Sequence, residues 1–170
     1  MKNIFNETIE SLENYFISIN EKKYRATQIY DYLYKKRIYD IKKMTNISNN
    51  LKEKILKDYN FDFIKIITKQ EDTDVKKYLF KLADGNTIES VVMYHNYGIS
   101  ICVSSQVGCN MGCAFCESGR LKKVRNLETY EIVEQLLLIE EDIKDRITHV
   151  VVMGIGEPFD NYDNVMNFIR

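Results

Sequence analysis

The stretch Gly108-Cys-Asn-Met-Gly-Cys-Ala-Phe-Cys-Glu-Ser-Gly119 contains three cysteines in the spacing Cys-x-x-x-Cys-x-x-Cys. Its asparagine and its glycines are typical of a loop rather than a packed strand. Three thiolates this close together, from Cys109, Cys113 and Cys116, can hold three corners of a 4Fe-4S cluster. The fourth iron is then left without a protein ligand, and an open iron can bind the amino acid end of S-adenosylmethionine and pass it an electron.

Other uses of these cysteines have to be weighed. Free cysteine is among the most frequently buried residue types, so inert core thiols are one alternative. Disulfides need an oxidising compartment, and nothing at the N-terminus resembles a signal peptide. A structural zinc site with Cys102 as the fourth ligand is the main alternative. Zinc sites usually use two Cys-x-x-Cys pairs separated by a spacer, and the sequence has one such pair.

Two motifs in order carry a resemblance to a known family. The segment 102–116, Cys-Val-Ser-Ser-Gln-Val-Gly-Cys-Asn-Met-Gly-Cys-Ala-Phe-Cys, resembles the cluster loop of the radical S-adenosylmethionine (radical SAM) RNA methyltransferases of the RlmN and Cfr type. Further along, Met153-Gly-Ile-Gly-Glu-Pro158 is similar to the Gly-x-Gly-Glu-Pro segment of that family. The resemblance implies an α/β protein whose catalytic domain is a partial barrel of six βα units.

The resemblance also implies an activity, methylation of an adenosine ring carbon in 23S rRNA, with tRNA as a second candidate substrate. Val107 and Pro158 look like the branch that modifies carbon 2 rather than carbon 8. The implied cofactors are a 4Fe-4S cluster and S-adenosylmethionine, with flavodoxin or ferredoxin as electron donor and a monomer as the full-length state. Two alternatives stay open, another radical SAM enzyme with a different substrate and a zinc-stabilised RNA-binding module without catalysis.

Eight residues receive a role from this resemblance. Cys109, Cys113 and Cys116 would ligate the cluster, and Gly154, Gly156 and Glu157 would bind S-adenosylmethionine. Glu89 would accept a proton. Cys102 would resolve a covalent RNA adduct through a transient disulfide. The cysteine that carries the methyl group in the family lies in its C-terminal part, and no cysteine follows Cys116 here.

Charge is nearly balanced over the 170 residues, with 24 Lys/Arg and 25 Asp/Glu, but it is unevenly distributed. Residues 20–57 are strongly basic and residues 127–170 strongly acidic. A basic block suggests contact with a polyanion such as RNA, although a solvated helical face is the simpler explanation for a single Lys-rich stretch. Lys122, Lys123 and Arg125 follow the cysteine loop, where an RNA backbone could approach. The absence of a long apolar run and of a targeting segment predicts a cytoplasmic protein without membrane contact.

Apolar spacing divides the chain into three predicted regions. Helices predicted at 4–19, 26–37 and 48–59 form a helical accessory domain, residues 1–60, that resembles an RNA-binding module. Residues 61–94 are predicted to be a β-hairpin connector, with a turn at Asp84-Gly85. Residues 95–170 are predicted to be the N-terminal part of the radical SAM core.

This core is predicted to contain a strand at 99–105, a helix at 127–141 and a buried parallel strand at 147–153. Because this is barely two of the six βα units, the chain is expected to be a truncated core that is inactive alone. Reactive groups lie on loops at the carboxyl ends of strands in α/β barrels, so both motifs are expected to open on one face.

Overall fold

The computed structural model describes all 170 residues, and it divides them into two compact units, Met1–Asp62 and Phe63–Arg170. The division into 1–60, 61–94 and 95–170 stays a prediction. Within the second unit the strands of residues 65–95 belong to the same sheet as the strands of the core. No helix is long and apolar enough to cross a membrane.

The first unit is helical, as the apolar spacing predicts. Its elements are a short strand β1 (Lys2–Asn3), α1 (Ile9–Ser18), α2 (Tyr24–Tyr30), a π-helical turn (Asp31–Lys35), a 3-10 turn (Ile41–Lys43), α3 (Asn49–Asp58) and β2 (Tyr59–Asn60), which pairs in parallel with β1. The predicted helix 4–19 is in fact a 3-10 turn (Ile4–Asn6) followed by α1, because Thr8 caps α1 by accepting a hydrogen bond from the Ser11 amide. Ser48 caps α3 in the same way, as predicted.

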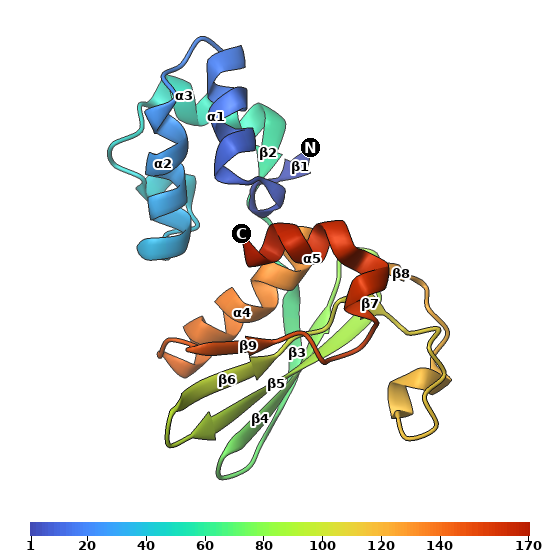
Figure 1. Cartoon of the computed structure of the whole chain (residues 1–170). Helices are drawn as coiled ribbons and strands as arrows, with labels where there is room; N and C mark the ends of the chain where they lie inside the picture. Colours follow the sequence, from blue (N-terminus) through green and yellow to red (C-terminus); the bar gives the residue numbers. More distant parts are fainter. The chain divides into compact units, whose positions relative to one another are not determined.

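The second unit is a five-stranded sheet with the strand order β3-β4-β5-β6-β9 (Figure 1). The strands are β3 (Lys65–Glu71), β4 (Val75–Lys81), β5 (Thr87–His95), β6 (Gly98–Cys102) and β9 (His149–Val151). Strands β3 to β6 are antiparallel to their neighbours, whereas β9 pairs in parallel with β6. Helix α4 (Thr129–Ile143) makes the crossover between β6 and β9, and α5 (Tyr162–Ile169) follows. The α/β class and the first βα units of the predicted partial barrel are confirmed.

One face of this sheet carries the core. Alternate residues of β4, β5 and β6 are buried against α4, and the cluster includes Tyr78, Phe80, Ile88, Val92, Ile101, Ile132 and Ile139. Because side chains alternate between faces along a strand, the residues between them lie on the opposite face. That second face therefore receives Lys77, Leu79, Glu89 and Cys102, and it is the face of interest for function.

The prediction of a buried strand at 147–153 is wrong in length and in burial. Only His149–Val151 pair in the sheet, and all three residues are exposed. Strand β9 has one neighbour, β6, so it is an edge strand, and the side chains of Val150 and Val151 remain 40% and 37% exposed. A continuous apolar run marks a strand that is covered on both faces only when neighbours are present to cover it.

A short ladder that the sequence did not predict closes the cysteine loop at its base. Strand β7 (Gln106–Val107) pairs antiparallel with β8 (Arg125–Asn126), on either side of the three cysteines. The loop between them contains a 3-10 turn, Glu117–Arg120, and it projects from the β7–β8 pair (Figure 1).

Candidate functional site

The two sequence motifs lie side by side at the carboxyl ends of β6 and β9. The amides of Ser105 and Gln106 both donate to the carbonyl of Ile155, at 2.9 and 3.1 Å. The amide of Gly154 donates to the carbonyl of Val103 at 3.0 Å. The turn Gly154–Glu157 is therefore hydrogen-bonded along the segment that leads into the cysteine loop, which agrees with two motifs opening on one face.

The two glycines of this turn are required by packing within the chain. A Cβ on Gly154 would lie 2.7 Å from the carbonyl oxygen of Val103, and one on Gly156 would lie 2.6 Å from Cβ of Gln106. Gly156 also has a φ of +113°, which side-chain-bearing residues rarely adopt. The family resemblance assigns these glycines to the binding of S-adenosylmethionine, whereas the structure also gives a cause inside the protein.

A substitution of Gly156 by Ala is expected to destabilise the second unit by more than about 1 kcal/mol, because strain and overlap with Gln106 add. Urea unfolding followed by circular dichroism measures this. Gly85→Ala is the control for backbone strain alone, since Gly85 has a φ of +88° and an added Cβ meets nothing within 4 Å. Equal losses in the two variants would contradict the packing argument.

Glu157 contributes its backbone and its side chain to the turn. Its amide donates to Oε1 of Gln106 at 2.9 Å, and its own Oε1 accepts from the amide of Phe159 at 3.0 Å. This second bond caps the 3-10 turn Pro158–Asn161. A carboxylate has room for several donors, so this cap leaves acceptor capacity for an ammonium group.

The structure places the three cluster cysteines on one loop but does not gather them. All three are free thiols, with Cys109 buried, Cys113 exposed and Cys116 half-buried. The loop is held by bonds from the Cys109 amide to the Leu121 carbonyl and from the Cys116 amide to the Cys113 carbonyl. No three His, Cys, Asp or Glu side chains are placed to hold a metal ion. The donor set, three reduced thiols within one short loop, fits a cluster chemically, and the ligand assignment stays a prediction.

Glu89 and Cys102 lie on the same face of the sheet. Cys102 on β6 is paired with Val91 on β5, and Glu89 is two residues from Val91, so their side chains point to one side. The Cys102 thiol is half-buried, and this burial raises its pKa, while a hydrogen bond from the Met153 amide acts in the opposite direction. The thiol is therefore kept protonated until a base approaches it.

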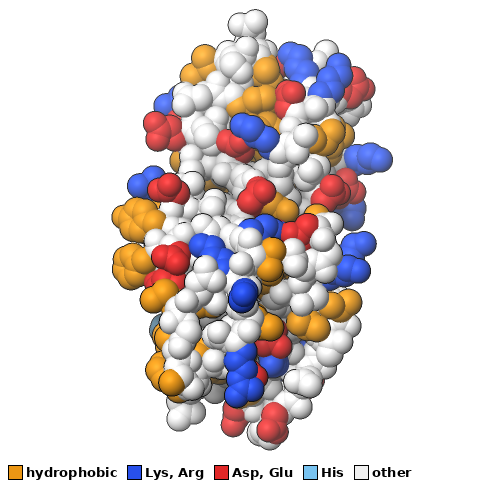
Figure 2. Space-filling model, turned by 90° about the vertical axis from the view of Figure 1, so that its right-hand side faces the viewer, with side chains coloured by type: hydrophobic (Ala, Val, Ile, Leu, Met, Phe, Trp, Pro, Cys, Tyr) orange, Lys and Arg blue, Asp and Glu red, His pale blue; other side chains and the backbone are white.

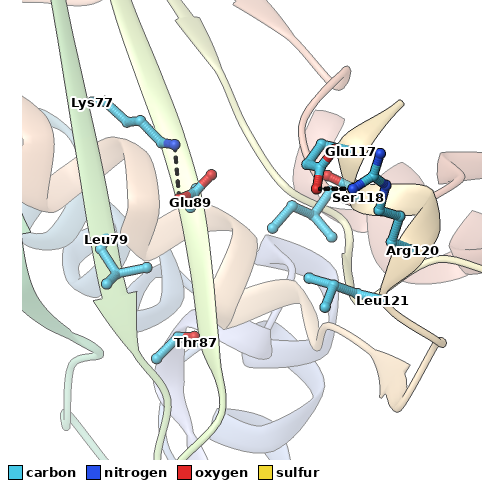
Figure 3. Close-up of a pocket in the computed structure, with 9 residues that line it drawn as sticks. Lys77, Leu79, Thr87, Glu89, Glu117, Ser118, Arg120 and Leu121 are labelled. Carbon is cyan, nitrogen blue, oxygen red and sulfur yellow. Dashed lines mark ion pairs between the residues drawn. The ribbon is translucent and has the colours of Figure 1, made fainter. Parts of the chain in front are cut away.

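A cavity of about 370 Å³ lies on this face (Figure 3). Its floor is formed by β4 and β5, one wall by the turn after Cys116, and a further contact by the Gly-Ile-Gly-Glu turn; the lining residues are Lys77, Leu79, Thr87, Glu89, Glu117, Ser118, Arg120, Leu121 and Ile155. The ammonium of Lys77 binds the carboxylate of Glu89 at 2.8 Å, and Arg120 binds Glu117 at 3.2 Å. The predicted proton acceptor thus lines a cavity beside the cysteine loop.

Arg125 has a different role from the phosphate contact that its position suggests. Its guanidinium binds Glu131 through two bonds of 2.7 and 2.8 Å, and its Nε binds Asp84 at 2.6 Å. Glu131 is buried and also completes a capping box with Glu128 at the start of α4. Arg125 therefore joins the base of the cysteine loop to α4 and to the predicted Asp84-Gly85 turn, and all three of its guanidinium nitrogens already have partners within the protein. Lys122 and Lys123 remain candidates.

The acid stability of the second unit should depend on Asp84. The hydrogen bond from Arg125 lowers the pKa of Asp84 from 3.8 to about 2. A carboxyl group with a depressed folded-state pKa stabilises the protein above its unfolded-state pKa, and this contribution is lost as the pH falls from about 4 to about 2. Asp84→Asn should cost less than about 1 kcal/mol at pH 7, because the pair is partly exposed. Urea unfolding at pH 7 and pH 2.5 should show this difference shrinking; a constant difference would contradict the ion pair.

Buried amide side chains complete the site, and sequence reasoning did not find them. Both polar atoms of the Gln135 side chain, on α4, make two hydrogen bonds. Its Oε1 accepts from the Ser90 hydroxyl and from the Ser104 amide, and its Nε2 donates to the carbonyls of Ser104 and Glu131. Asn161 donates to the carbonyls of Ser105 and Leu127. Their sequence signal is weak, since it consists only of polar residues on an apolar helix face and after a turn.

Comparisons with known proteins agree with this geometry. Residues 2–60 match the family model described as ribosomal RNA large subunit methyltransferase N-terminal domain, and residues 103–170 match that of the radical SAM superfamily. A probable dual-specificity RNA methyltransferase RlmN from Enterococcus faecalis is 47% identical over 99% of this chain and 49% of its own length. Over nearly its whole length the chain is a homologue of the RlmN type of radical SAM methyltransferases.

Two further relatives of this family extend the match. A probable RlmN from Streptococcus thermophilus is 49% identical over 98% of this chain and 44% of its own length. The crystal structure of a radical SAM methyltransferase from Sphaerobacter thermophilus superposes with a TM-score of 0.89 at 30% identity, covering all of this chain and 51% of that one. The chain spans about half the length of the curated relatives it matches. The family resemblance drawn from the cysteine loop and the Gly-x-Gly-Glu-Pro segment is confirmed.

Proposed function

We propose that this chain supplies the cluster-binding and cofactor-binding half of a radical SAM enzyme that methylates carbon 2 of an adenosine in 23S rRNA, with tRNA as a second substrate. The observation that carries the proposal is the hydrogen-bonded contact between the Gly154–Glu157 turn and the segment that enters the cysteine loop. This contact supports the proposal because it brings the Gly154–Glu157 turn beside the segment that leads into the cysteine loop. Flavodoxin or ferredoxin would supply the electron.

The roles follow from the chemistry of the side chains. Cys109, Cys113 and Cys116 would hold a 4Fe-4S cluster, and Glu157, with Gly156, would bind the ammonium group of S-adenosylmethionine. When bound, these two groups supply a 5′-deoxyadenosyl radical, which is cofactor chemistry and not side-chain chemistry.

Glu89 would accept the proton that leaves the modified ring carbon, since its carboxylate lines the cavity on the functional face of the sheet. Lys77 keeps that carboxylate against β4 through a 2.8 Å ion pair. The Cys102 thiol lies on the same face and would resolve a covalent adduct with the RNA. Its raised pKa means that a base must take its proton before it attacks.

Basic residues of the first unit would supply RNA affinity without reading sequence. Several lysines there are already paired with carboxylates, including Lys23 with Glu13 and Lys35 with Asp31. Lys42 and Lys43 are exposed on the 3-10 turn Ile41–Lys43, and the Lys52 ammonium donates to the Lys42 carbonyl beside them. On the face shown in Figure 2, basic and acidic side chains are intermixed, so a local cluster of lysines is a better candidate than a whole face.

Anaerobic reconstitution tests the proposal. The purified chain is expected to take up about four irons and four sulfides, and the reduced sample to show an EPR signal that changes when S-adenosylmethionine is added. Uptake of one zinc and no iron would instead support a zinc-stabilised RNA-binding module. Binding of iron without an effect of S-adenosylmethionine would contradict the assignment of the Gly154–Glu157 turn.

A further inference from the structure

The side chain of Gln106 connects the two motifs from a fully buried position. Gln106 lies on β7, three residues before Cys109, and has no exposed surface. Its Oε1 accepts a hydrogen bond from the Glu157 amide at 2.9 Å, and its Nε2 donates to Oδ1 of Asn126 at 2.8 Å. The side-chain amide of Gln106 thus connects β7, which enters the cysteine loop, both to β8, which leaves it, and to the Gly-Ile-Gly-Glu turn.

A second set of contacts makes this connection a closed ring. The amide nitrogen of Asn126 donates to the carbonyl of Asp160 at 2.8 Å, in the 3-10 turn that directly follows Glu157. The aliphatic part of Gln106 packs on Gly156 so tightly that an added Cβ would lie 2.6 Å away. Both the stem and the amide of Gln106 therefore contact the turn, and no backbone hydrogen bond joins Glu157 to the cysteine loop.

We propose that Gln106 is a positioning residue that holds Glu157 at a fixed place relative to the cysteine loop. The inference rests on the proposed function, because Glu157 and the three cysteines would bind two ends of one assembly, the amino acid part of S-adenosylmethionine and the cluster. A carboxylate that has to meet an ammonium group beside a metal centre needs a fixed distance to that centre. Buried partners that orient ligands in this way commonly change affinity by about tenfold or more when they are removed.

Gln106→Met removes both hydrogen bonds and keeps the length of the side chain. Hydrogen exchange of the peptide containing residues 154–157 should become about tenfold faster, whereas exchange of β5 should not change. After reconstitution, the variant should retain its iron, and the dissociation constant for S-adenosylmethionine should rise about tenfold. Unchanged exchange at 154–157 together with an unchanged dissociation constant would overturn the inference.

Tyr78→Phe is the matched control. It also removes a hydrogen bond of the second unit, from the Tyr78 hydroxyl to Asp142 at 2.8 Å, but on the face that packs against α4. It should leave the exchange of 154–157 and the affinity for S-adenosylmethionine at wild-type values. If it weakened the affinity as much as Gln106→Met does, a general loss of stability would explain both variants and the inference would fail.

Two measurements keep the inference testable if Gln106→Met does not fold. Gln106→Glu retains an acceptor for the Glu157 amide and should preserve protection of 154–157, and a loss of that protection would contradict the inference. In the wild-type chain, the Glu157 amide should exchange more slowly than the exposed amides of the cysteine loop. These exchange experiments need neither iron nor S-adenosylmethionine. A chain that binds neither would refute the proposed function, whereas the exchange of residues 154–157 would still show whether Gln106 holds the turn.

Discussion

Replacing Arg125 by Met is expected to lower the free energy of unfolding of the second unit by about 3–5 kcal/mol, the largest stability change we predict. The reason is the environment of Glu131, whose side chain is 2% exposed and receives both terminal nitrogens of Arg125. Removing the guanidinium leaves a buried carboxylate without its main partner. The desolvation free energy of the Glu131 carboxylate is then no longer compensated. This uncompensated free energy is larger than the net stabilisation that the intact ion pair provides.

The matched control is Arg120→Met, which removes another arginine–glutamate pair from the same segment of the chain. Arg120 and Glu117 have side chains that are 79% and 81% exposed, so this loss should change stability by less than about 0.5 kcal/mol. Arg125→Lys should fall between the two, because one ammonium cannot reproduce the two parallel bonds to Glu131. Urea unfolding followed by circular dichroism measures all three, and similar losses for Arg120→Met and Arg125→Met would refute the argument from burial.

The elements of this fold with strong local signals could be predicted from the sequence. Apolar spacing indicated the helices of the first unit and α4, and Ser48 marked the start of α3. Asp84-Gly85 marked the turn between β4 and β5, where Gly85 has a φ of +88° and the Asn86 amide donates to the Asp84 carboxylate. Each of these helices and turns is determined by residues that lie close together in the sequence, so it can be predicted without knowing the tertiary contacts.

What could not be predicted depends on neighbours distant in the sequence. The exposure of β9 follows from its having one neighbour in the sheet. The β7–β8 ladder is too short to have an apolar pattern of its own. The ion pairs of Arg125 were not predicted because its partners lie 41 residues before it and 6 residues after it. Gly156 was recognised as important for a different reason from the one that the structure shows, its contact with Gln106.

The second large effect concerns the metal. Replacing Cys113 by Ala is expected to reduce the iron bound after anaerobic reconstitution from about four per chain to less than about one, because two thiolates cannot hold a cubane cluster with three protein ligands. Cys113 is the most informative of the three cysteines, since its side chain is exposed and its removal leaves no hole in the core. Loss of iron in this variant therefore reports ligation and not unfolding, which circular dichroism checks on the same sample.

Cys102→Ala is the control that distinguishes an iron–sulfur cluster from a structural zinc ion. Cys102 lies on β6, outside the cysteine loop, and its thiol receives a hydrogen bond from the Met153 amide. A three-thiolate cluster does not need it, so this variant should keep about four irons. A four-ligand zinc site would need it, and there Cys102→Ala should weaken metal binding as much as Cys113→Ala does. The ratio of metal retained by these two variants thus decides between a cluster with one open iron and a closed structural site, because only the former leaves a place for S-adenosylmethionine.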